Sequence, residues 1–213
     1  ATERACNYWL PMVNDLKGII IGGPGATKDF VVKNDYFHHE IKKLIAEPFF
    51  DVGYSNESGL RELVQRAGST MDQIELDVER TIVDRFLQEV MQANPKATYG
   101  EVMIRSALDQ GAVETLLISE AVTKRRVKWI CKECKNTWKT SHDKSSAPPN
   151  CPQCGSDKAF EDEEDSMELI DELTVLAGHT SAKVRIISLD TEEGATLNTA
   201  FGGIAALLRY AIS

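Results

Sequence analysis

Short apolar runs alternate with helical patterns through the first block of the chain. Residues 16–21 form a β-branched run that ends in a glycine-rich loop, which predicts a buried strand. Residues 35–45 have a helical pattern, and residues 48–54 predict a second strand. Asn56 is a suitable N-cap for a further helix, and Gly68 is its expected end. The block is small for an independent core, so we interpret it as the second half of an α/β domain.

A longer alternating pattern follows. Capping boxes at Thr70 and Thr98 predict one helix over about residues 71–93 and another that ends near Gly111. Helices that alternate with strands predict an α/β sandwich with a short central sheet. The remaining predicted elements are strands at residues 113–119, 183–188 and 204–212 and a helical turn near Leu197.

The alternation is interrupted between about residues 124 and 172, where charge is sorted by sign. Residues 124–139 include seven basic residues and one acidic residue, together with Trp129 and Trp138. Residues 161–172 include eight acidic residues and no basic one. We interpret the acidic run as a solvated linker or the first turn of a helix, with a docking surface for a basic partner as the alternative.

Four cysteines in this interruption have the spacing of metal ligands. Cys131-x2-Cys134 is followed, sixteen residues later, by Cys151-x2-Cys154. Each two-residue gap lets a turn direct two thiolates at one ion, and two such turns complete a tetrahedron. Four protein ligands leave no open position, so the spacing predicts a structural zinc site. Iron and a metal-free redox dithiol are the alternatives.

Composition narrows the class of protein. The apolar fraction is 42% and the charged fraction 27%, as in folded soluble domains. The net charge of −9 disfavours wholesale non-specific binding to nucleic acid. No apolar run approaches the roughly 20 residues that cross a bilayer, and the start does not resemble a signal peptide. An odd number of cysteines, five, favours a reducing compartment, so we expect a cytoplasmic protein without a membrane partner.

The glycine-rich loop at residues 22–28 is the main candidate for nucleotide chemistry. It lacks the Gly-Lys-Ser/Thr ending of a Walker A loop, because Thr27 precedes Lys28 and Asp29 follows it. A structural turn is the simpler interpretation, and a nest in which Lys28 contacts a phosphate backbone is the alternative. The sequence offers no catalytic constellation, so we expect a protein that is not itself an enzyme.

Several segments, in order, resemble the archaeal and eukaryotic class-1 peptide chain release factors. The resemblance covers essentially the whole chain, and the four cysteines match a minidomain inserted in archaeal-type members. Segments similar to the second half of the middle domain are LKGIIIGGPGATKDFV, YFHHEIKKLI and DVGYSNESGLRELV. Segments similar to the C-terminal domain are ERTIVDRFLQEV, GEVMIRSALDQGAVETLLIS and FGGIAALLRYAI. The domains expected are residues 1–70 and 71–213, with the minidomain at about 125–165.

The resemblance implies a factor that enters the ribosomal A site at a stop codon. There it promotes hydrolysis of peptidyl-tRNA together with an elongation-factor-like translational GTPase. In the family, an N-terminal domain reads the codon and a Gly-Gly-Gln loop of the middle domain reaches the peptidyl-tRNA. No Gly-Gly-Gln occurs in these 213 residues, and the family alignment places it before Ala1, as expected for a fragment. No catalytic or codon-reading residue is therefore assigned.

We expect this part of a release factor to act as a scaffold that binds partners. The C-terminal domain would dock the GTPase, and the partial middle domain would support the missing loop. The basic insert is a candidate for contact with ribosomal RNA, since Lys and Arg neutralise phosphate and aromatic side chains stack on bases. Alternatives are a Pelota-like ribosome-rescue factor, a zinc-ribbon ribosomal or RNA-binding protein, and a phosphate-dependent enzyme. The residues predicted to contact RNA are Lys28, Lys124, Arg125, Arg126, Lys128, Lys132 and Lys135.

Overall fold

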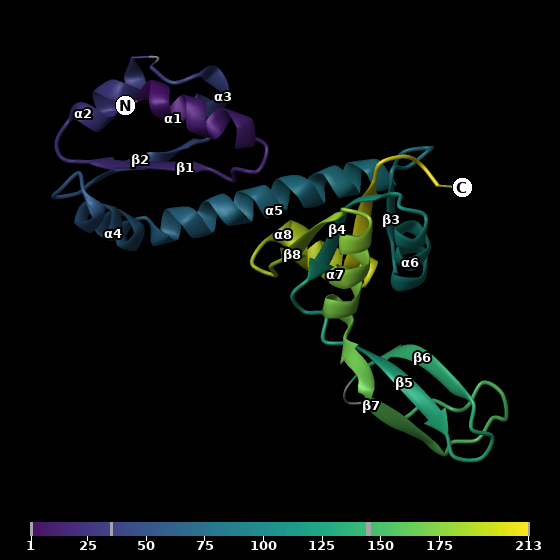
Figure 1. Cartoon of the computed structure of the whole chain (residues 1–213). Coiled ribbons are helices and arrows are strands. Elements are labelled where there is room, and N and C mark those ends of the chain that lie inside the picture. The colour runs from purple at the N-terminus through teal and green to yellow at the C-terminus, as the bar shows by residue number, and fades with distance from the viewer. Residues whose placement is uncertain (1, 35, 144–145, 213) are drawn as a thin grey trace. The chain divides into compact units, whose positions relative to one another are not determined.

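The computed structural model describes residues 2–34, 36–143 and 146–212 (Figure 1). The chain divides into two compact units, Ala1–Val78 and Glu79–Ser213, and helix α5 (Gly68–Val90) runs through the boundary. Within the described residues, no helix is both long and apolar enough to cross a membrane.

The first unit contains a two-stranded parallel sheet with helices around it. Strand β1 pairs with β2 from Ile19 opposite Ile45 to Gly23 opposite Asp51. Cys6, Ile19 and Ile41 form its buried centre. Its elements are α1 (Thr2–Trp9), the short 3-10 helix η1 (Leu10–Met12), β1 (Ile19–Gly23), α2 (Thr27–Lys33), α3 (His39–Lys43), β2 (Ile45–Asp51) and α4 (Glu57–Arg66).

The predictions for this unit are confirmed in type and partly wrong in extent. The Asn56 cap is confirmed, because its Oδ1 accepts the amide hydrogen of Gly59 at 3.2 Å. The helix predicted over 35–45 is reduced to α3, since β2 already begins at Ile45; residue 35 lies outside the described residues. Helix α4 ends at Arg66, two residues before the predicted stop at Gly68. Gly68 also begins α5, so the predicted start at Met71 is three residues late.

The second unit has a four-stranded sheet with the order β3-β9-β4-β8. The central strand β4 is parallel to β8 and antiparallel to β9, which in turn is antiparallel to β3. Its strands and helices are β3 (Ala97–Tyr99), α6 (Glu101–Asp109), β4 (Val113–Ser119), α7 (Leu169–His179), β8 (Lys183–Ile187), α8 (Glu192–Phe201) and β9 (Ile204–Leu208).

Helices cover both faces of this sheet because successive strand residues point to opposite sides. Leu116 and Ile118 of β4 pack in one cluster with residues of α6 and α7. Leu117, between them, packs in the second cluster with residues of α5 and α8. The result is a three-layer α/β/α sandwich, which confirms the predicted fold class.

Two local predictions in the sandwich differ from the structure. The Thr98 capping box is wrong: Thr98 pairs with Ala206 in the sheet, and Gly100, with φ of +80°, occupies the N-cap of α6. The last strand ends at Leu208 and not at residue 212. Strand β4, in contrast, spans the predicted residues 113–119.

A second, three-stranded antiparallel sheet is inserted between β4 and α7. Its order is β6-β5-β7, formed by β5 (Arg125–Cys131), β6 (Thr137–His142) and β7 (Ala159–Glu168). We call residues 125–168 the cysteine module. Figure 1 shows β7 running directly into α7. The interpretation of the acidic run as a linker is therefore wrong: its residues form most of β7 and the first turn of α7.

Candidate metal centre and the charged cluster beside it

The four predicted ligands meet at one end of the cysteine module. The Sγ atoms of Cys131, Cys134, Cys151 and Cys154 all lie within 4.8 Å of one another. Two of the separations, Cys131 to Cys154 and Cys134 to Cys151, are 3.6 and 3.5 Å. A tetrahedral ion with sulfur ligands at about 2.3 Å requires sulfurs about 3.8 Å apart, whereas a disulfide requires about 2 Å. All five cysteines of the chain are free.

Both ligand pairs are held by the same backbone turn. The carbonyl of Cys131 accepts the amide of Lys135 at 3.1 Å, and the carbonyl of Cys151 accepts that of Gly155 at 2.8 Å. The amide of each first cysteine donates to the residue five positions later. The fifth residue of each turn has positive φ, +61° at Lys135 and +74° at Gly155. The two turns are therefore equivalent, although only the second has the glycine that this conformation favours.

The electrostatics of the four thiols favour a cation between them. The amide of Cys134 lowers the pKa of Cys131. Burial opposes ionisation of Cys151, but the amides of Cys154 and Gln153 outweigh it and lower its pKa to about 6. The amide of Asn136 favours the Cys134 thiolate, yet burial and the three neighbouring sulfurs outweigh it and raise that pKa to about 12. Four thiolates cannot carry charge together without a metal ion to compensate them.

The donor set and its geometry thus fit a tetrahedral metal ion. Cys131 and Cys151 are buried, whereas Cys134 and Cys154 are exposed, so the site lies at the edge of the module. With four protein ligands, an ion there has no open position for substrate and acts as a structural cross-link between the two turns.

The basic and acidic runs of the sequence face each other across the sheet. Arg125 Nη1 lies 2.7 Å from Glu161 Oε1. Lys128 Nζ lies 3.0 Å from Asp162 and 2.6 Å from Asp165. The hydrogen bond from Lys128 lowers the pKa of Asp165, and the two aspartates raise the pKa of Lys128. Acidic residues of the module therefore neutralise Arg125 and Lys128 of the basic run.

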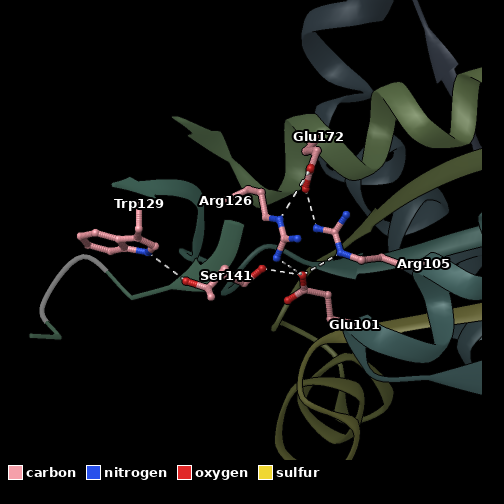
Figure 2. Close-up of polar contacts among 7 residues, drawn as sticks. Glu101, Arg105, Arg126, Trp129, Ser141 and Glu172 are labelled. Atoms are coloured by element: carbon pink, nitrogen blue, oxygen red, sulfur yellow. Dashed lines mark hydrogen bonds and ion pairs between the residues drawn. The ribbon is translucent and has the colours of Figure 1, made fainter. Parts of the chain in front are cut away.

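A second charged cluster joins the module to the sandwich. Glu101, the first residue of α6, accepts hydrogen bonds from Arg105 Nε at 2.8 Å and from Ser141 Oγ at 2.5 Å, and Arg126 Nη1 lies 3.5 Å away. All three reach the same oxygen, Oε1. Arg105 also donates to Glu172 of α7. Figure 2 shows both glutamates pointing at the two guanidinium groups.

The two arginines of this cluster are held differently. Burial opposes the charge of Arg105, but its hydrogen bonds to Glu172 and Glu101 outweigh burial and raise its pKa. Arg126 has only longer contacts, 3.5 Å to Glu101 and 3.8 Å to Glu172. Its Nε is buried and has no hydrogen-bond partner within the described part of the chain. Arg105 alone therefore compensates the two glutamates closely, and Arg126 adds a weaker second contact.

The other residues predicted to contact RNA lie in different surroundings. Lys28 donates to the carbonyl of Gly25 and to Asp51, and its side chain is 7% exposed. This bond closes the glycine-rich loop onto β2 and favours the structural interpretation of the loop. Lys124, Lys132 and Lys135 are exposed, with no carboxylate within 4.0 Å among the residues described. Lys132 Nζ lies 5.8 Å from the centre of the Phe160 ring.

The sequence predicts the four cysteine ligands, but no sequence pattern identifies Glu101, Ser141 and Glu172 as members of the charged cluster. The four-residue spacing of Glu101 and Arg105 is a helical ion-pair pattern and is visible in the sequence. The contact with Arg126 depends on how the module enters the sandwich, which no local pattern shows.

Comparisons with known proteins match both parts of the chain. Residues 2–73 match the protein family described as eRF1 domain 2, and residues 76–212 match eRF1 domain 3. The chain is 43% identical over 219 aligned residues to peptide chain release factor subunit 1 of Thermococcus onnurineus, covering 99% of this chain and 52% of that protein. The corresponding Pyrococcus abyssi protein is 42% identical, with the same coverage. The chain thus spans about half the length of these curated relatives.

Solved structures give the same picture of the fold. The C-terminal domain of peptide chain release factor from Methanosarcina mazei has a TM-score of 0.60 and 39% identity, covering 74% of this chain and 98% of that one. A structure titled as ribosome-bound archaeal Pelota and ABCE1 also has a TM-score of 0.60. Its identity is 19%, covering 100% of this chain and 49% of that one, so this likeness concerns the fold alone.

Proposed function

The chain belongs to the eRF1 family of peptide chain release factors, and from this premise we propose that it is the scaffold and partner-docking part of a translation termination factor. The observation that carries the proposal is that the chain matches both family domains in their order. Its sequence is also 37–43% identical to those of archaeal release factors. The ribosome-bound Pelota structure shares the fold at a lower identity, 19%, and we therefore propose a release factor rather than a rescue factor.

The proposed division of labour follows the two domains. Residues 1–70 form the later part of the middle domain and support the loop that reaches peptidyl-tRNA. Residues 71–213 form the C-terminal domain, which docks an elongation-factor-like GTPase on the ribosome. The factor works in the cytoplasm, and the ribosome carries out the hydrolysis that the factor promotes. This chain contributes positioning and no bond-breaking group.

A release assay and a binding assay together test this proposal. On ribosomes halted at a stop codon with labelled peptidyl-tRNA, we expect the chain alone to release no peptide above background. We expect it to bind an elongation-factor-like GTPase saturably, with unchanged affinity after metal removal, because docking belongs to the sandwich. Peptide release by the chain alone, or failure of the intact chain to bind the GTPase, would contradict the proposal.

The metal proposed for the four cysteines is zinc. Four thiolates in a closed tetrahedral set suit zinc, and equivalent turns that each supply two cysteines are typical of structural zinc sites. Cys131, Cys134, Cys151 and Cys154 would hold the ion, which supplies a cross-link and no reaction chemistry. Elemental analysis of protein purified under reducing conditions tests the assignment. One zinc per chain supports it, and iron with a thiolate charge-transfer spectrum contradicts it.

Contact with ribosomal RNA is proposed mainly for Lys124, Lys132 and Lys135. These exposed lysines lack a carboxylate partner among the described residues, so their charge is available to phosphate. Phe160, 41% exposed and beside Lys132, offers a ring on which an unpaired base can stack. Lys28, Arg125, Arg126 and Lys128 already face carboxylates, and we expect them to contribute less.

Two single substitutions with the same change in net charge test the RNA contact. Lys132→Ala should weaken binding to ribosomal RNA in a filter assay and flatten its salt dependence. Lys128→Ala, at a lysine paired with two aspartates, should leave the affinity closer to that of the wild type. Equal effects of the two substitutions, or no effect of Lys132→Ala, would contradict the proposed surface.

A further inference from the structure

The cysteine module is joined to the sandwich at a narrow junction. The chain enters it through residues 120–124 and leaves it where β7 becomes α7. Arg125 opposite Glu168 is the last pair of the module's own sheet, and beside it the Leu169 amide donates to the Lys124 carbonyl at 2.9 Å. So small a backbone connection leaves the orientation of the module to side-chain contacts beside it.

We propose that Glu101, Arg105, Arg126, Ser141 and Glu172 form a releasable latch that holds the cysteine module in one orientation on the sandwich. The latch has a fixed part and a moving part. Glu101, Arg105 and Glu172 belong to α6 and α7 of the sandwich, whereas Arg126 and Ser141 are opposite each other on β5 and β6 of the module. Figure 2 shows Arg126 and Ser141 directed toward Glu101.

Geometry makes the latch releasable. Arg105 holds both glutamates at hydrogen-bond distance without help from the module. Arg126 touches the same two carboxylates at 3.5 and 3.8 Å, longer than good charged hydrogen bonds. If the module turns away, Glu101 and Glu172 therefore keep a partner. Opening does not strand both carboxylates without compensation, which is the costly outcome for a partly buried ion pair.

The charges also make the closed position specific. The two glutamates and Arg105 carry a net charge of −1, and Arg126 brings the sum to zero. The side chains of Arg105, Arg126, Glu101 and Glu172 are each 21% exposed, so the attraction acts in a partly dry environment. Ser141 of β6 adds a directional hydrogen bond to Glu101.

Amide relaxation by NMR tests the latch in the intact chain. In the wild type, amides of β5 and β6 should have the same rotational correlation time as amides of β4 and β9. In the double variant Arg126→Ala/Ser141→Ala, which removes both side chains that the module contributes to the latch, the correlation time of the module should fall below that of the sandwich. Arg126→Ala alone should lower it less, because Ser141 still donates to Glu101. Zinc content and the chemical-shift dispersion of the module should not change, since the cysteine site is intact.

Arg125→Ala is the matched control. Arg125 is the adjacent arginine on the same strand, but it pairs with Glu161 inside the module. We expect it to leave the two correlation times equal, and we expect Arg126→Lys to restore part of the coupling. Raising salt from about 0.1 to 1 M shortens the screening length from about 10 to 3 Å. It should separate the two correlation times in the wild type and should not separate them further in Arg126→Ala/Ser141→Ala. Equal correlation times in Arg126→Ala/Ser141→Ala, or the same separation in Arg125→Ala, would overturn the latch.

Discussion

Removing the metal should unfold the cysteine module and leave the sandwich folded. Among the described residues of the module, Val127 and Trp129 are the buried apolar side chains besides cysteines, at 2% and 4% exposure. At ~25 cal/mol per Å² of apolar surface, burial of Val127 stabilises the module by about 2 kcal/mol and burial of Trp129 by about 4–6 kcal/mol. Binding of a structural zinc ion contributes roughly 10–16 kcal/mol in small zinc peptides, which exceeds the contribution of the two side chains. The sandwich has two extensive apolar clusters of its own and does not depend on the ion.

Tryptophan fluorescence can report on the module alone. The chain has three tryptophans, and Trp9→Phe leaves Trp129 and Trp138, which pair across β5 and β6. Chelation of this variant should shift the emission to the red as both indoles enter water. Circular dichroism at the same time should retain the main thermal transition of the sandwich.

Two cysteine substitutions provide the matched comparison. Cys151→Ser removes a ligand and should produce the red shift without chelator, whereas Cys6→Ser, at a buried cysteine far along the chain from the four ligands, should retain the metal. Unshifted emission from protein shown to be metal-free would refute the reasoning. So would loss of the whole thermal transition on chelation, because the sandwich would then need the ion.

Three further predictions concern the two units. Gly59→Ala should destabilise the first unit by about 3 kcal/mol or more, because the new Cβ would lie 1.7 Å from a backbone carbonyl oxygen. Gly68→Ala is the control: its Cβ would meet open space, so the melting temperature should be nearly unchanged. Leu117→Ala should lower the free energy of unfolding of the sandwich by about 2–5 kcal/mol in urea titrations, and an unchanged midpoint would contradict its place in the core. The hydrogen bond from Arg85 lowers the pKa of Glu114 below its ordinary value of 4.5. The ion pair therefore stabilises the fold fully above pH 4.5, and this stabilisation is lost as the pH falls through the lowered pKa of Glu114. Glu114→Gln should therefore flatten the fall of melting temperature between about pH 6 and 3, and an identical acid limb would refute the assignment.

An element of the fold can be predicted from the sequence when neighbouring residues determine it, and not when pairing with a distant segment does. Strand β4 was predictable over residues 113–119 because a central strand is apolar on both faces. The Thr98 capping box failed because pairing of Thr98 with Ala206 outweighed a local preference for a helix cap. Gly68 follows the end of α4 as predicted, and it also begins α5, which the capping box at Thr70 places two to three residues too late.

The same distinction applies to the site. The cysteine spacing is a local pattern, and the four sulfurs lie where it predicts. The end of the acidic run forms the first turn of α7, as one interpretation predicts. The rest is a strand and not a linker, because its partner is a basic strand about 35 residues earlier, and only pairing of β5 with β7 brings Arg125 to Glu161. Complementary charge in two runs of similar length is the signal that could have suggested this pairing.

The hydrogen bond between Leu169 and Lys124 places the two ends of the cysteine module side by side. An insertion whose ends meet can be gained or lost in a single genetic event, since a tight turn can replace it without changing the strand order of the host sheet. Such a deletion would leave Arg105 as the lone counterion for Glu101 and Glu172. A relative that lacks the module but carries both glutamates should therefore also carry an arginine at the position of Arg105.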